Sequence, residues 1–150
     1  MRYADLLLMA AEAWNEAEET PNEKVYDYLD QVRERAGLEG IKETYAKYAS
    51  AQYKDYPSHK SQMRDIIHRE RQGELSCEGS YYWDTRRWKT AEKELNRIVQ
   101  GWNVLNGETA EDYYIPTNIY NQQFTLRDYF APIPDGDIIR NPQLVQNPWW

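Results

Sequence analysis

Two amphipathic stripes separated by a proline constrain the fold of this chain more than any other feature. Across residues 2–18, apolar side chains recur every three or four positions, as they do on one face of a helix. The stripe ends before Pro21, because the residue preceding a proline is disfavoured in helical backbone, and Asn22 can cap a new helix. A second stripe then runs to Gly37, which suits a left-handed C-terminal cap. So short a turn makes the two helices antiparallel neighbours, which predicts a helical hairpin over residues 2–37.

A second helical hairpin is predicted over residues 61–100. Its first helix is expected from about Ser61 to Cys77, and its second from about Tyr81 to just before Gly101. Both carry apolar residues at helical spacing, so the chain repeats the helix-turn-helix arrangement.

The remaining segments lack a helical period. Residues 38–57 are rich in Tyr and Lys and are expected to be a surface loop with at most a helical turn. In the irregular segment 101–150, the turn signal Asn106-Gly107 allows one short β-hairpin. Residues 130–150 hold four of the seven prolines but are too apolar for a solvated tether. We therefore expect a mainly α chain, a single domain over 1–150, with the proline-rich C-terminal segment packed on the helices.

Charge and composition exclude several classes of protein. The chain has 18 Lys and Arg against 25 Asp and Glu, a formal charge of −7, which argues against nucleic acid as a partner. The sequence has no run of about 18 apolar residues, which is the length that a membrane-spanning helix needs. A single cysteine cannot form an internal disulfide or a structural zinc site, and phosphate-binding glycine motifs are absent. The sequence therefore predicts no metal and no cofactor.

Carboxylates occupy positions on the helical stripes where apolar residues are expected, two on the third helix and one on the fourth. Arginines lie close to them in the sequence and are suitable partners for carboxylates that face a core. The group could be a carboxylate set for acid/base chemistry or a buried ion network between the third and fourth helices. Arginine neighbours lower the pKa of a carboxyl and so spoil a general acid, which favours the network and predicts no catalytic residue. The predicted network comprises Glu70, Arg71, Glu74, Asp84, Arg86 and Arg87.

Three aromatic residues of the irregular segment are candidate ligand contacts. Trp102, Tyr113 and Tyr114 could stack on the flat apolar faces of sugars while nearby amides bind hydroxyl groups. Alternatively, they could cover the ends of the helical core, and core packing is the commoner role for such residues.

Three stretches together resemble the C-terminal part of the SusD/RagB family of glycan-binding outer-membrane lipoproteins. The opening run RYADLLLMAAEAWNEA and the following YLDQVRERAGL are similar to the family's helix pair. The central block is IIHRERQGELSCEGSYYWDTRRW, and the ending is YFAPIPDGDIIRNPQLVQNPWW. Two positions depart from the family pattern, because Tyr81 replaces a common Arg and Trp149 replaces the penultimate Gly.

The resemblance implies tetratricopeptide-like hairpins and a non-catalytic role. It implies a protein on the extracellular face of the cell outer membrane that captures an oligosaccharide or polysaccharide for nutrient uptake with a SusC-like TonB-dependent transporter. It also implies that most sugar-contacting loops and the lipid-bearing cysteine lie upstream of the matched region. Two alternatives from other classes are a free-standing helical-repeat module that binds proteins and a glycosidase that uses two of the stripe carboxylates.

Overall fold

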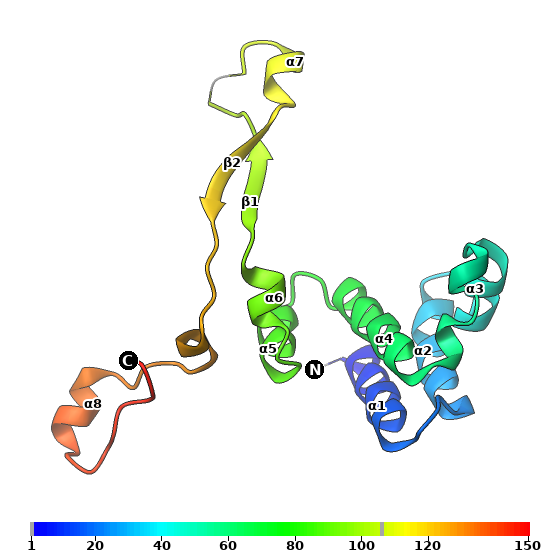
Figure 1. Cartoon of the computed structure of the whole chain (residues 1–150), viewed down its shortest axis with the longest axis horizontal. Coiled ribbons are helices and arrows are strands. Elements are labelled where there is room, and N and C mark those ends of the chain that lie inside the picture. The colour runs from blue at the N-terminus through cyan, green and yellow to red at the C-terminus, as the bar shows by residue number, and fades with distance from the viewer. Residues whose placement is uncertain (1, 106) are drawn as a thin grey trace. The chain divides into compact units, whose positions relative to one another are not determined.

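The computed structural model describes residues 2–105 and 107–150 and is mainly helical, as predicted (Figure 1). Its contacts divide the chain into two compact units, residues 1–81 and residues 82–150.

The first helical hairpin is confirmed. It consists of α1 (Tyr3–Ala17) and α2 (Glu23–Arg35), which pack against each other. Asn22 caps α2 as expected, since its side chain accepts hydrogen bonds from the first backbone amides of the helix. Gly37 follows the end of α2 with a φ of 76°, the left-handed conformation that glycine adopts without strain.

The core of the first unit forms where α4 (Lys60–Glu74) packs against α1. Apolar residues from α1, α2 and α4 form one buried cluster, so the stripes seen in the sequence are the buried faces of these helices. The side chains in the core that are fully shielded from solvent are Leu8, Ala11, Val25, Leu29, Met63 and Ile67. The third helix predicted to reach Cys77 is shorter than expected: α4 ends at Glu74, and a turn follows in which Cys77 has a φ of 64°.

The segment 38–57, expected to be a loop with at most a helical turn, contains a further α-helix. α3 (Ile41–Tyr48) is followed by two short 3-10 turns, η1 (Ala51–Tyr53) and η2 (Tyr56–Ser58). The N-cap residue of α3, Gly40, has no side chain to cap the helix. Asp30 of α2 supplies the cap instead, because its Oδ1 accepts a hydrogen bond from the backbone amide of Ile41 at 2.8 Å.

We expect Asp30→Ala to lower the free energy of unfolding by about 1 kcal/mol, the usual effect of losing a helix N-cap. Urea denaturation followed by far-UV circular dichroism measures this change. The matched control is Asp27→Ala on the exposed face of the same helix, which should change stability by less than about 0.5 kcal/mol. Equal effects of the two substitutions would mean that the Asp30 carboxylate does not stabilise α3.

The fourth helix, predicted to continue from Tyr81 to just before Gly101, is interrupted. α5 (Ser80–Arg87) and α6 (Ala91–Leu95) are separate helices, and Lys89 between them has a φ of 57°, which no α-helix can contain. The backbone then becomes extended before Gly101, in β1 (Ile98–Trp102).

β1 pairs in antiparallel fashion with β2 (Pro116–Asn121) to form a two-stranded ribbon, the one β-hairpin that the sequence allowed. Trp102 lies opposite Pro116, and the register shifts between Val99 and Gln100. The connection between the strands contains α7 (Ala110–Tyr113), which Figure 1 shows at the end of the ribbon. Of the predicted turn Asn106-Gly107, Asn106 lies outside the described residues.

The C-terminal segment has little regular structure, namely η3 (Leu126–Tyr129) and α8 (Asp135–Arg140). Phe124 is buried, and its backbone N–H and C=O both bond to the side chain of Asn96 after α6, which attaches this segment to the helices of the second unit. Packing does not extend to every apolar residue of the tail, because Val145 is 83% exposed.

Candidate functional site

A largely buried ion pair of the first unit joins Arg33 of α2 to Glu70 of α4. Arg33 also donates to Thr44 Oγ1 and to the Glu39 carbonyl, both at 2.9 Å. Only 9% of the Arg33 side chain and 23% of the Glu70 side chain are exposed. A single guanidinium therefore connects α2 with α3 and α4.

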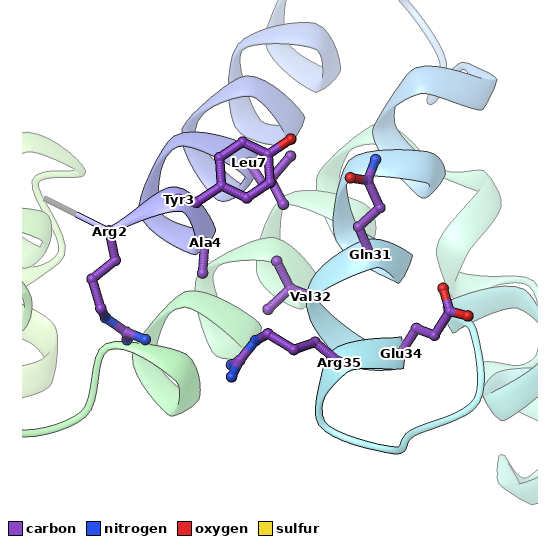
Figure 2. A pocket seen from close by; sticks show the side chains of 8 residues that line it. All are labelled: Arg2, Tyr3, Ala4, Leu7, Gln31, Val32, Glu34 and Arg35. Carbon is purple, nitrogen blue, oxygen red and sulfur yellow. The ribbon is translucent and has the colours of Figure 1, made fainter.

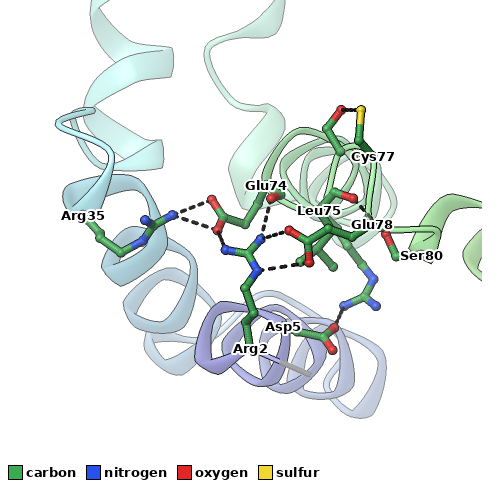
Figure 3. Close-up of polar contacts among 10 residues, drawn as sticks. Arg2, Asp5, Arg35, Glu74, Leu75, Cys77, Glu78 and Ser80 are labelled. Atoms are coloured by element: carbon green, nitrogen blue, oxygen red, sulfur yellow. Dashed lines mark hydrogen bonds and ion pairs between the residues drawn. The ribbon is translucent and has the colours of Figure 1, made fainter.

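Glu74 accepts hydrogen bonds from two arginines that belong to different helical ends (Figure 3). Arg2 Nη1, just before α1, lies 2.9 Å from Glu74 Oε1, and Arg35 Nη2, at the end of α2, lies 2.7 Å from both carboxylate oxygens. Arg2 also binds Glu78, and this hydrogen bond together with the one to Glu74 raises the pKa of the Arg2 guanidinium. The Glu74 carboxylate thus holds the start of α1 and the end of α2 beside the end of α4.

The partners predicted for Glu70 and Glu74 are therefore wrong. Both carboxylates bind arginines of α2 or of the segment before α1, and neither binds Arg71, Arg86 or Arg87. The reason is geometric. Because α4 packs beside the first hairpin, arginines of that hairpin lie within hydrogen-bonding distance of the α4 carboxylates.

The other members of the predicted network make contacts within their own units. Arg71 Nη1 donates to Asp5 of α1 at 2.7 Å. Asp84 is buried and accepts a hydrogen bond from Arg87 Nε at 2.8 Å within α5. Arg86 lies over the ring of Tyr82, with its Cζ 3.5 Å from the ring centroid. Each of the three predicted carboxylates is thus hydrogen-bonded to arginine; Glu70 and Glu74 connect different helices, whereas the bond from Arg87 to Asp84 lies within α5.

A groove beside these ion pairs lies between the start of α1 and the end of α2. It encloses about 390 Å³ between Ala4 and Leu7 of α1 and Val32 of α2. Figure 2 shows Arg2 and Arg35 pointing toward each other across one end, where both bind Glu74. Because these charges are already paired, the groove offers mainly apolar surface to a ligand.

The candidate ligand contacts lie together near the end of the β-ribbon. Tyr114 is edge-on to both Trp102 and Tyr113, with ring centroids 5.6 Å and 5.1 Å apart. Trp102 is 52% exposed and Tyr114 is 62% exposed, so these rings do not cover a helical core. The three aromatic residues that were candidate ligand contacts therefore form one cluster, in which Trp102 and Tyr114 are exposed.

A larger cavity in the second unit was not predicted from the sequence. About 820 Å³ is enclosed by α5, α6 and the C-terminal segment, with the rings of Trp83, Tyr129, Phe130 and Trp149 on its walls. One feature of the sequence does point to this cavity: Trp149 departs from the family pattern by placing a large ring where glycine is usual. Aromatic side chains together with a few charged groups, here Arg86 and Arg87, are a common lining of small-molecule sites.

Two features are absent from residues 2–105 and 107–150. There, no three His, Cys, Asp or Glu side chains come together in a way that could hold a metal ion. The same residues contain no helix with the length and apolar character needed to cross a lipid bilayer.

The family model described as the SusD family matches residues 1–150. SusD-like protein P2 from Formosa agariphila is 32% identical over 147 residues, which are 98% of this chain and 24% of that protein.

Solved structures agree with this match. A SusD-like carbohydrate binding protein from Bacteroides fragilis is 25% identical, with a TM-score of 0.69 over 95% of this chain and 27% of that one. A SusD homolog from Bacteroides thetaiotaomicron is 26% identical, with a TM-score of 0.58 over 100% of this chain and 26% of that one. The chain thus spans about a quarter of the length of the relatives it matches.

Proposed function

Because the chain belongs to the SusD family, we propose that it is the non-catalytic C-terminal part of a cell-surface protein that binds glycans for nutrient uptake. The observation that carries this proposal is the family match along the whole chain. It is supported by the B. fragilis relative described as a carbohydrate binding protein, which shares the fold over 95% of this chain. Both units, residues 1–81 and 82–150, would belong to this one SusD-like region.

Within this region, we propose Trp102, Tyr113 and Tyr114 as sugar contacts. The exposed rings of Trp102 and Tyr114 offer apolar faces on which a pyranose can stack, and Tyr113 packs edge-on against Tyr114. A sugar site also needs several placed polar groups that fix the orientation of the ligand, so the aromatic cluster does not by itself make a complete site. It would add to the affinity of a longer protein without forming a complete site.

The partner and the location also follow from the family. We propose that the full-length protein lies on the extracellular face of the outer membrane and passes its glycan to a SusC-like TonB-dependent transporter. Co-purification of a tagged full-length protein from outer membranes tests this partnership. Absence of any TonB-dependent transporter from the purified material would contradict it.

The 150-residue chain by itself is expected to bind oligosaccharides only weakly, with dissociation constants of about 1 mM or higher, equivalent to about 4 kcal/mol or less. Isothermal titration with a panel of plant and host glycans measures this. Tyr114→Ala should weaken any residual binding at the aromatic cluster, whereas Tyr120→Ala, an exposed tyrosine of β2 outside the cluster, should not. Saturable binding far below 1 mM that needs Tyr114 would show a complete site at the ribbon.

A further inference from the structure

A second cavity lies in the first unit, between α3, the two 3-10 turns and α4, and contains none of the candidate residues discussed above. It encloses about 400 Å³, within the range of about 300 to 1,000 Å³ that is usual for small-molecule sites. Ile66 of α4 is buried and contributes apolar surface to the cavity. The cavity therefore combines a ligand-sized volume with an apolar lining.

Three tyrosines contribute to the walls of this cavity. Tyr45 of α3 and Tyr56 of η2 are partly buried against the hydrophobic core, which holds their rings in place. Tyr53 of η1 is edge-on to Tyr56, with ring centroids 4.9 Å apart and planes at 86°. Rings in these orientations present aromatic surfaces together with hydroxyl groups.

Helix α4 also contributes polar side chains to the lining of the cavity. Gln62, Asp65 and Arg69 are three and four residues apart, so they project in the same direction. Among the described residues, the side chains of Asp65 and Arg69 make no hydrogen bond or ion pair. The side-chain amide nitrogen of Gln62 likewise has no acceptor. An acceptor and two donors are thus available to a ligand beside the aromatic rings.

We propose that this cavity is a sugar subsite that takes one neutral pyranose ring of a glycan. A pyranose has a flat apolar face for a tyrosine ring and hydroxyl groups that need both donors and acceptors. One carboxylate and one guanidinium balance each other in charge, which favours a neutral ligand over a charged one. This inference rests on the proposed glycan-binding function and adds a site separate from the ribbon.

Saturation-transfer difference NMR on the 150-residue chain tests the proposal with the methyl glycosides of glucose, galactose and mannose as probes. We expect at least one glycoside to bind with a dissociation constant in the millimolar range. Tyr53→Ala should weaken it at least about tenfold, since Tyr53 is 41% exposed and its removal spares the core. Asp65→Asn, which keeps the shape of the side chain, should also weaken binding measurably. The matched control is Tyr48→Ala, an exposed tyrosine of α3 outside the cavity, which should bind as the parent chain does.

The outcomes separate this site from the proposed function. Binding that survives Tyr53→Ala and Asp65→Asn but is lost in Trp102→Ala would overturn the subsite and leave the glycan function in place. If none of the three glycosides bound, the subsite would also be overturned. The same holds if the cavity bound the zwitterion glycine and not the neutral glycosides. The proposed function would then be judged separately, by glycan binding of the full-length protein.

Discussion

Leu8→Ala is expected to lower the free energy of unfolding by about 3 to 4 kcal/mol. Leu8 is 0% exposed and lies in the core shared by α1, α2 and α4. The substitution removes buried apolar surface and leaves a cavity that the surrounding helices cannot fill, and both effects destabilise the fold. Urea denaturation followed by circular dichroism at 222 nm measures the loss.

The same helix provides a matched control for this substitution. Leu6 is 47% exposed, so Leu6→Ala removes the same atoms from a position that buries far less surface. We expect it to cost less than about 1 kcal/mol, since alanine also has the higher helix propensity. If the two substitutions destabilised the chain equally, α1 would not face the core through Leu8.

Glu70→Ala is expected to have the second-largest effect, a loss of about 2 to 3 kcal/mol. It leaves the guanidinium of Arg33 without its carboxylate while Arg33 itself stays buried. Breaking a buried pair costs about 3 to 5 kcal/mol, and partial exposure of Glu70 together with the remaining bonds of Arg33 reduces this figure. Thermal and urea denaturation both report the change.

Two variants separate loss of the ion pair from loss of side-chain bulk. Glu70→Gln keeps an oxygen acceptor for Arg33 and should recover part of the lost stability. Glu23→Ala removes an exposed carboxylate that pairs with Lys42 and should cost less than about 0.5 kcal/mol. A Glu70→Ala chain as stable as the Glu23→Ala chain would show that the Arg33–Glu70 pair adds nothing to stability.

The first hairpin could be predicted from sequence because all its determinants are local. The spacing of apolar residues defines the buried face of each helix, Asn22 begins α2, and Gly37 ends it. The break between α5 and α6 was missed because the apolar spacing continues across it. A periodic pattern reports which face is apolar, and it does not report that Lys89 adopts a left-handed backbone.

Ion pairing shows where local reasoning stops. The sequence indicated correctly that the carboxylates on the helical stripes need arginine partners, but it suggested arginines close to them in the chain. Glu70 and Glu74 instead bind Arg33 and Arg35, which only the packing of the first hairpin beside α4 brings near. The cavity of Tyr45 and Tyr53 could not be predicted for the same reason, because residues far apart in the sequence, from α3, η1, η2 and α4, line it together.

The cap that Asp30 provides for α3 also restricts which sequences this fold can accept. Gly40 has an ordinary backbone conformation, yet a Cβ atom there would lie 2.9 Å from Asp30 Oδ2. A side chain at position 40 therefore requires the Asp30 carboxylate on another helix to shift, and this is the carboxylate that accepts the hydrogen bond from the Ile41 amide. The absence of a side chain at position 40 and the helix cap from position 30 are thus coupled: a residue larger than glycine would disturb the start of α3 through Asp30.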